Sequence, residues 1–281
     1  MTGLRAAVGL LTRLPVSSAE QHEGGPPVAS GQRPQWEEGP RAGTVAGSAP
    51  RSGSSWDLAP RAMTWFPLVG AFVGGVGVLT WLIVDALVGP TPAAVAAVLM
   101  TIVVTGALHE DGLADTVDGL WGGASPMRRL EIMRDSGIGT YGALALAGDL
   151  LLRVGLLAPL DLPDVARALI AGAVIGRFAP LVIVRWLPAA RPDGLGAGVA
   201  DGIGRVTWLI AGCTVIAAAV VAGGPWAPVL LAAAAGPVWL VGRAASRRIG
   251  GFTGDILGAA VLTSNLAVIA VVAALAKAGV F

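Results

Sequence analysis

The sequence predicts an all-α protein, a polytopic integral membrane helical bundle with about seven spans. Of its 281 residues, 54% are hydrophobic and only 13% are charged, whereas an average soluble domain carries about 25% charged residues. So few charged side chains cannot cover a soluble globule of this size with the usual mixed surface. The apolar residues also gather in runs of about 20 residues, the length that a helix needs to cross a bilayer.

The composition excludes several other classes of protein. The formal net charge is +1, so a basic surface of the kind that binds nucleic acid is not expected. Cys213 is the only cysteine, which excludes an internal disulfide framework and a cysteine-based zinc site. Membrane lipid is an expected partner, and the sequence leaves open whether the chain forms a homo-oligomer.

Three regions follow one another along the chain. Residues 1–16 predict a short amphipathic helix at the membrane interface, with Leu4, Val8, Leu11 and Leu14 as its apolar contacts. Residues 17–60 are rich in Gly, Pro, Ser and Glu without a helical or strand period, which predicts a flexible cytoplasmic loop. Residues 61–281 form the membrane-embedded domain, whose functional loops are expected at 109–142 and 243–255.

The expected spans lie in six apolar runs, one of which is long enough for two spans. These runs cover residues 62–84, 86–108, 140–160, 165–187, 206–242 and 256–276. Gly223-Gly224-Pro225 interrupts the run at 206–242, which predicts two spans joined by a tight turn. The total is therefore about seven spans.

The basic residues lie almost entirely on one side of this arrangement. Arginines are concentrated in residues 1–61, 109–139, 188–205 and 243–255, whereas Lys277 is the one basic residue outside the spans on the opposite side. Short loops that are rich in Lys and Arg stay in the cytoplasm. The long loops, including the functional ones, are therefore expected to be cytoplasmic.

The most informative motif is a cluster of acidic residues between 109 and 135. Asp111, Asp115 and Asp118 have i, i+4, i+7 spacing, so on a helix their carboxylates share one face. Like charges this close raise one another's pKa unless a cation lies among them, and the sequence has no Lys or Arg between residues 109 and 127. Carboxylate oxygens favour a hard cation, Mg²⁺ or Mn²⁺. The alternative is a solvated acidic loop.

Two glycine-rich segments on the same side of the membrane can bind an anion. Arg134-Asp135-Ser136 precedes the closely spaced Gly137, Gly139 and Gly142, and the backbone N–H groups of such a turn can face an anion. Arg247-Arg248 precedes a Gly250-Gly251 turn, and paired arginines suit a diphosphate. The alternatives are a simple helix-to-loop junction and positive-inside arginines beside an interfacial turn.

Charged residues also occur inside the predicted spans. Asp149 and Arg153 are four residues apart on one helix, and we expect them to neutralise each other. Arg177 lies near the middle of its span, where a charge without a partner is costly. It is expected to reach an anionic group of the site, or Asp85 or Asp149.

These segments together resemble the cobalamin synthase family, in order and over almost the whole chain. The segments are Thr12-Arg13-Leu14-Pro15, Trp65-Phe66-Pro67-Leu68-Val69-Gly70, 109–119, 131–142 and 250–259. The acidic motif and the Arg134-Asp135-Ser136 turn are the specific ones. The loop at 17–60 is longer than the family pattern before the first span, and Asp149 within a span also departs from that pattern.

The resemblance implies that adenosylcobinamide-GDP reacts with α-ribazole, or its 5′-phosphate, to give adenosylcobalamin, or its 5′-phosphate, and GMP. It implies Mg²⁺ as cofactor and the bacterial cytoplasmic (inner) membrane as location. Asp111, Asp115 and Asp118 are then expected to hold the metal, with Glu110 or Asp135 as the proton acceptor. The residues expected to contact phosphates or substrate are Arg134, Ser136, Arg177, Arg247, Arg248, Gly250, Gly251, Thr253 and Asp255.

Two other functions fit parts of the sequence. A CDP-alcohol phosphotransferase performs similar chemistry with CMP as the leaving group, but this chain has Asp115 where that pattern has Arg, and it lacks the later half of the pattern. A cation transporter would use its carboxylates near the bilayer midplane, whereas these carboxylates are predicted at the cytoplasmic edge.

Overall fold

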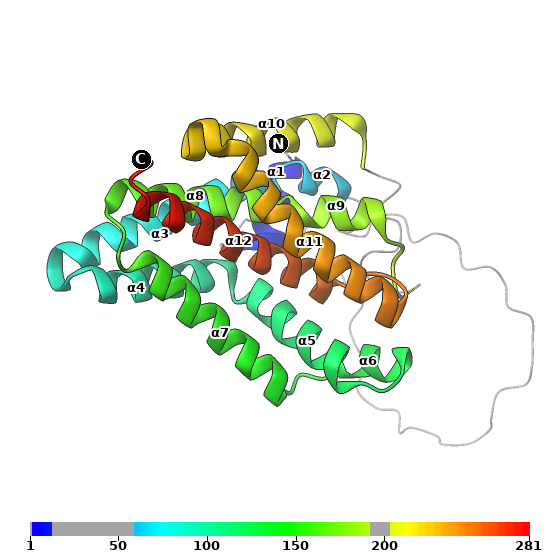
Figure 1. Ribbon diagram of the computed structural model, residues 1–281. Helices are drawn as coiled ribbons and strands as arrows, with labels where there is room; N and C mark the ends of the chain where they lie inside the picture. Colours follow the sequence, from blue (N-terminus) through cyan, green and yellow to red (C-terminus); the bar gives the residue numbers. More distant parts are fainter. Residues whose placement is uncertain (1, 13–58, 192–202) are drawn as a thin grey trace, which may run out of the picture.

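The computed structural model is a bundle of helices (Figure 1). It describes residues 2–12, 59–191 and 203–281, so nearly all of the loop predicted at 17–60 lies outside the described residues. The α-helices are α1 (Thr2–Leu11), α2 (Ala59–Met63), α3 (Phe66–Val88), α4 (Pro90–Thr105), α5 (Leu108–Gly122), α6 (Pro126–Ile132), α7 (Thr140–Leu157), α8 (Leu162–Gly176), α9 (Ala179–Trp186), α10 (Arg205–Gly223), α11 (Ala227–Ile249) and α12 (Gly254–Lys277). Within the described residues, β structure is limited to one isolated bridge between Ala189 and Phe252. The predicted all-α class is confirmed.

Five helical segments of the described chain are long and apolar enough to cross a membrane. They are α3, α7, α8 with α9, α10 with α11, and α12; counting the bent pair α4 and α5 as one span gives six. The expected number was about seven. The count is lower because the 45-residue segment from α10 to α11 enters it once, although the short turn Gly224–Trp226 separates its two helices where a tight turn was predicted. In addition, α4 ends after 16 residues.

Glycine and proline set the helix ends that shape the bundle. Gly89, with φ 93°, separates α3 from α4, whose first residue is Pro90. Gly106 and Ala107 both have positive φ, and the chain there turns by 90° from α4 into α5. Because α5 carries four acidic residues and charge is costly within the hydrocarbon region, we treat α5 as lying outside the membrane-spanning segments.

Helix α12 lies in the middle of the bundle and organises the packing (Figure 1). It packs against α5, α7, α8, α9 and α11. The contact with α5 is a close approach of backbones, because a Cβ built on Gly112 would lie 3.2 Å from the Cα of Gly258. Small residues at a helix contact allow such an approach, and here it places the acidic helix α5 against the start of α12.

The contact between α3 and α8 supplies a test of this packing. A Cβ on Gly70 would lie under 3.0 Å from the backbone of Ala173, whereas a Cβ on Gly75 meets nothing within 4 Å. Gly70→Ala should therefore lower the melting temperature of the purified protein by about 5 °C through overpacking, and Gly75→Ala should leave it unchanged. Equal melting temperatures for the two variants would contradict the α3–α8 contact.

The N-terminal helix α1 is amphipathic, with one face against the bundle. Ala7 and Leu11 are buried, whereas Leu4 and Leu10 are exposed. Helix α1 packs against α2 and α3. Of the apolar contacts predicted for this helix, Leu11 thus lies in the core and Leu4 faces outward, while Leu14 lies outside the described residues. The location of the helix at the membrane interface stays a prediction.

Candidate functional site

Three segments far apart in the sequence meet at one end of the bundle. The Phe252 N–H donates to the Pro188 carbonyl at 2.9 Å, and the Phe252 carbonyl accepts from the Ala190 N–H at 2.9 Å. Arg191 Nη2 donates to the Leu130 carbonyl at 2.7 Å. The loop after α9 therefore holds the turn before α12 on one side and α6 on the other.

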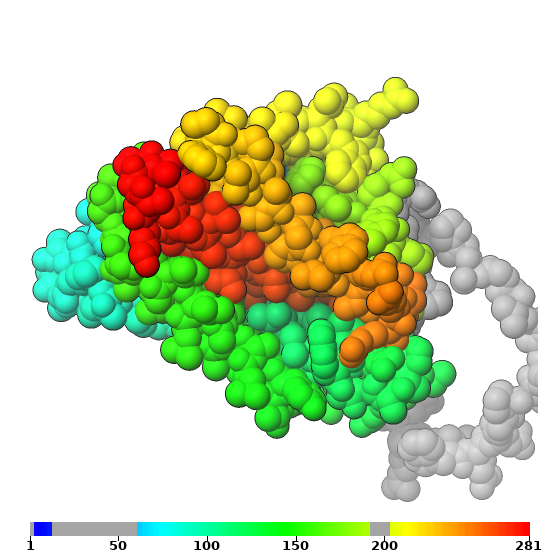
Figure 2. All heavy atoms as spheres, in the orientation of Figure 1, coloured from blue at the N-terminus to red at the C-terminus, as the bar shows by residue number. Residues whose placement is uncertain are grey.

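The end of α11 is also hydrogen-bonded to segments at this end of the bundle, α5 and α6. Arg129 Nη1 donates to the Arg248 carbonyl at 3.1 Å, and Arg248 Nη1 donates to the Leu120 carbonyl near the end of α5. The Arg248 guanidinium also lies 4.7 Å from the ring centroid of Trp121. Figure 2 shows the end of α11, in orange, against the green atoms of α5 and α6. The Arg248 side chain therefore makes its contacts within the protein.

The acidic motif lies on helix α5, the conformation in which its spacing places Asp111, Asp115 and Asp118 on one face. Its acidic residues differ in exposure. Asp111 is exposed, Asp115 is partly exposed and Asp118 is buried. Asp111 and Asp115 thus present oxygens to the surface, whereas Asp118 faces the start of α7.

The buried carboxylate of Asp118 holds the glycine-rich turn. Its Oδ2 accepts from the Gly139 N–H at 2.8 Å, and its Oδ1 accepts from the Gly142 N–H at 2.9 Å. These N–H groups belong to the N-terminal end of α7, where an anion is stabilised. The turn does present N–H groups to an anion, as predicted, but in this structure the anion is Asp118.

Asp115 is influenced by four other carboxylates. We call the five together the carboxylate face: Asp111, Asp115, Asp118, Asp135 and Asp255. Burial, followed by the negative charges of the other four, raises the pKa of Asp115 to about 7. Asp255 comes from the first turn of α12, and its Oδ2 accepts from Thr253 Oγ1 at 3.1 Å. The structure therefore adds Asp255 to the acidic residues that the spacing brought together.

The donor atoms of the carboxylate face are of the kind that binds a hard divalent cation. Its donors are all carboxylate oxygens, which are typical Mg²⁺ ligands, and mutual repulsion of the kind that raises the pKa of Asp115 is relieved by a cation. Within the described residues, no three His, Cys, Asp or Glu side chains are arranged so that they can hold a metal ion. In this arrangement a cation would therefore have fewer than three of these side chains as ligands, and water or substrate oxygens would complete its coordination.

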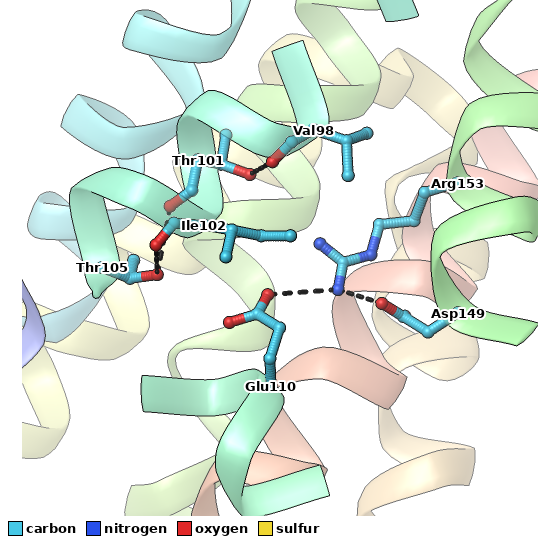
Figure 3. A network of polar contacts seen from close by, with 7 residues as sticks. All are labelled: Val98, Thr101, Ile102, Thr105, Glu110, Asp149 and Arg153. Carbon is cyan, nitrogen blue, oxygen red and sulfur yellow. Dashed lines mark hydrogen bonds and ion pairs between the residues drawn. The ribbon is translucent and has the colours of Figure 1, made fainter. Parts of the chain in front are cut away.

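Glu110 lies on a different side of α5 from Asp111. It is buried, and its Oε1 lies 3.4 Å from Arg153 Nη2 on α7. Arg153 also pairs with Asp149, as predicted, and Figure 3 shows this guanidinium between the two carboxylates. Arg177 is buried as well and donates to the Ala173 carbonyl at 3.1 Å. Glu110 and Arg177 therefore share an internal environment, and the roles predicted for them in the site stay predictions.

The other expected substrate contacts divide into exposed and packed groups. Arg134, Ser136, Asp135 and Arg247 are exposed. Gly250 ends α11 with φ 77°, a conformation that favours glycine. A Cβ on Gly251 would lie under 3.0 Å from the Pro188 carbonyl oxygen. The two glycines are thus explained by the chain turn and by packing, whereas Arg134 and Arg247 are exposed to solvent.

Sequence reasoning did not single out two residues that the structure brings into polar clusters. Arg191 joins the segments at the end of the bundle, and Asn265 lines an internal polar cavity. A signal for Asn265 was present, because an amide side chain is unusual in an uncharged apolar run. Arg191 carried no local signal beyond its charge.

The fold and the site together define a multi-pass helical membrane protein with a carboxylate-rich site at one end of its bundle. The model of the family described as cobalamin-5-phosphate synthase matches residues 41–273. The chain belongs to this family.

Curated relatives agree with this assignment. A protein of Azorhizobium caulinodans is 44% identical over 209 residues, which cover 69% of this chain and 76% of the relative. A protein of Bradyrhizobium diazoefficiens is 43% identical over 217 residues (75% and 82%), and one of Escherichia coli K12 is 35% identical over 211 residues (73% and 85%). All three are named adenosylcobinamide-GDP ribazoletransferase. No solved structure matches the chain.

Proposed function

We propose that this protein is an adenosylcobinamide-GDP ribazoletransferase that acts in cobalamin biosynthesis. The carboxylate face at one end of a membrane bundle, in a chain of this family, is the observation that carries the proposal. The enzyme transfers the adenosylcobinamide-phosphate group of adenosylcobinamide-GDP to α-ribazole, or to its 5′-phosphate. The product is adenosylcobalamin, or its 5′-phosphate, and GMP is released.

Asp111 and Asp115, with Asp118 and the added Asp255, are the proposed ligands of Mg²⁺. Asp111 and Asp115 are the more accessible, because both oxygens of Asp118 already accept backbone N–H groups. When bound, Mg²⁺ neutralises diphosphate charge and stabilises the leaving GMP. The exposed Arg134 and Arg247 add positive charge for the phosphates.

Asp135 is the better placed of the two predicted proton acceptors. It is exposed and interacts electrostatically with Asp115, whereas Glu110 is buried and paired with Arg153. In the reaction, the ribose hydroxyl attacks the phosphorus that bears the cobinamide group, and its proton passes to Asp135. The bond from this phosphorus to the oxygen of GMP breaks, and GMP leaves with that oxygen.

Release of GMP tests the function directly. The purified protein should form GMP from adenosylcobinamide-GDP only when α-ribazole or its 5′-phosphate and Mg²⁺ are present, and chelation by EDTA should abolish the reaction. Release of CMP from a CDP-alcohol, without reaction of adenosylcobinamide-GDP, would favour a CDP-alcohol phosphotransferase. Cation flux in proteoliposomes without either reaction would favour a transporter.

The site is proposed to face the cytoplasm of a bacterial inner membrane. Ser125 and Ser246 are exposed on the segments that form the site, and Cys213 is exposed too. In a Cys213→Ser background, cysteines introduced at Ser125 and Ser246 should react with an impermeant thiol reagent only after the inner face is opened. Labelling of either position in intact cells would contradict this orientation.

A further inference from the structure

A small polar cavity lies inside the bundle, beside the bend from α4 into α5. Its volume is about 30 Å³, and its polar lining includes Thr101, His109, Glu110, Arg153, Arg177 and Asn265. These residues come from α4, α5, α7, α12 and the C-cap position that follows α8. Figure 3 shows Glu110 and Arg153 on one side of this region and the polar residues of α4 on the other. The polar lining thus brings together four helices and the end of α8.

Several buried polar atoms of the lining have no partner in the protein. They are Oε2 of Glu110, Nε of Arg153, Nε of Arg177 and Oδ1 of Asn265. Glu110, Arg153 and Arg177 are 8%, 3% and 3% exposed. A buried polar group without a hydrogen bond is costly. The cavity therefore offers two N–H donors and two oxygen acceptors that a ligand can satisfy.

Charge and size identify the chemistry of this ligand. The network that borders the cavity contains two carboxylates, Glu110 and Asp149, and two guanidinium groups, Arg153 and Arg177. Their charges cancel, so neither a cation nor an anion is favoured. A water molecule needs about 10–15 Å³ of such space and commonly makes three hydrogen bonds to buried polar groups. The volume of about 30 Å³ therefore admits about two water molecules.

We propose that this cavity is a built water site, in which ordered water joins Arg177 to Glu110 and Asn265. Arg177 then completes a neutral network with Glu110, Arg153 and Asp149. This network fixes the start of α5 to α7, α8 and α12, and so positions the carboxylate face on the same helix. Arg177 is accordingly a positioning residue. This last consequence rests on the proposed function, whereas the water site does not.

A double-mutant cycle in the full-length protein tests the coupling of Arg177 to Glu110. Each single variant, Arg177→Gln and Glu110→Gln, leaves an unbalanced buried charge and should lower the melting temperature by about 5 °C or more. The double variant is neutral again and should recover at least half of the summed loss. Full additivity of the two losses would overturn the proposal. Arg128→Gln and Glu131→Gln, at an exposed ion pair, should change the melting temperature little.

Asn265→Leu tests whether the cavity holds water. Leu has nearly the shape of Asn but lacks its amide oxygen. If the cavity is hydrated, the variant removes an acceptor from the water and should lower the melting temperature by a few degrees. If the cavity is dry, the variant removes a buried oxygen without a partner and should raise the melting temperature, which would overturn the water site.

The positioning role has its own readout. At a temperature where all variants are folded, Arg177→Gln and Glu110→Gln should each raise the Mg²⁺ concentration for half-maximal activity several-fold, and the double variant should restore it. An unchanged Mg²⁺ requirement in both single variants would overturn the positioning role. If wild-type protein shows no transferase activity, the proposed function fails, while the melting temperatures still decide the water site.

Discussion

Asp115→Asn is expected to lower turnover by at least about 10²-fold, the usual order for loss of a positioned electrostatic stabiliser. Asp115 lies within the carboxylate face and has a pKa raised to about 7. The substitution keeps the shape of the side chain and removes its negative charge. It should also raise the Mg²⁺ concentration needed for activity, because one proposed ligand loses its charge. Asp111→Asn should likewise lower turnover and raise the Mg²⁺ concentration needed for activity. GMP release at varied Mg²⁺ measures both effects.

Glu131→Gln is the matched control for these variants. Glu131 is exposed on α6 and pairs with Arg128 at 3.0 Å, so its loss should change neither turnover nor the Mg²⁺ requirement. All variants must first elute as monodisperse protein in detergent, because misfolding would also lower turnover. Near-normal rates for both Asn variants at limiting Mg²⁺ would show that the carboxylate face is not the metal site, even within this family.

Gly142→Ala is expected to be the most damaging substitution of a small residue in the site. A Cβ on Gly142 would lie under 3.0 Å from Asp118 Oδ2 and 3.0 Å from the Ala114 carbonyl oxygen. The new methyl group must therefore displace the Asp118 carboxylate from the N–H groups of Gly139 and Gly142. We expect a melting temperature lower by about 5 °C or more and turnover reduced by at least about tenfold.

Gly148→Ala on the same helix provides the comparison. A Cβ on Gly148 meets nothing within 4 Å, so this variant should match wild type in melting temperature and turnover. Gly139→Ala should resemble Gly142→Ala, since its Cβ would also lie under 3.0 Å from the Asp118 carboxylate. If Gly142→Ala is as stable and active as Gly148→Ala, Asp118 does not hold the glycine-rich turn in solution.

The sequence by itself determined the class of the protein and much of the acidic helix. Long apolar runs are a local property, so they predicted a helical membrane bundle without knowledge of its packing. The i, i+4, i+7 spacing likewise predicted that Asp111, Asp115 and Asp118 lie on one face of a helix. The pair of Asp149 with Arg153 followed from the same helical geometry, because both partners lie on one helix.

The tertiary structure alone decided which groups surround each of these side chains. The N–H groups of Gly139 and Gly142 donate to the Asp118 carboxylate, because α5 and the start of α7 pack together. Glu110 and Asp111 are neighbours in the chain, yet Glu110 pairs with Arg153 in the interior, while Asp111 is exposed.

Contacts between distant segments also set the composition of the site. Asp255 joins the carboxylate face from α12, and Arg177, at the end of α8, and Asn265, on α12, border the same cavity as Glu110. The bend between α4 and α5 and the joined segment α10–α11 gave fewer candidate spans than the apolar runs predicted. Residue spacing determines the face of one helix, whereas the partner of that face depends on how helices far apart in the sequence pack.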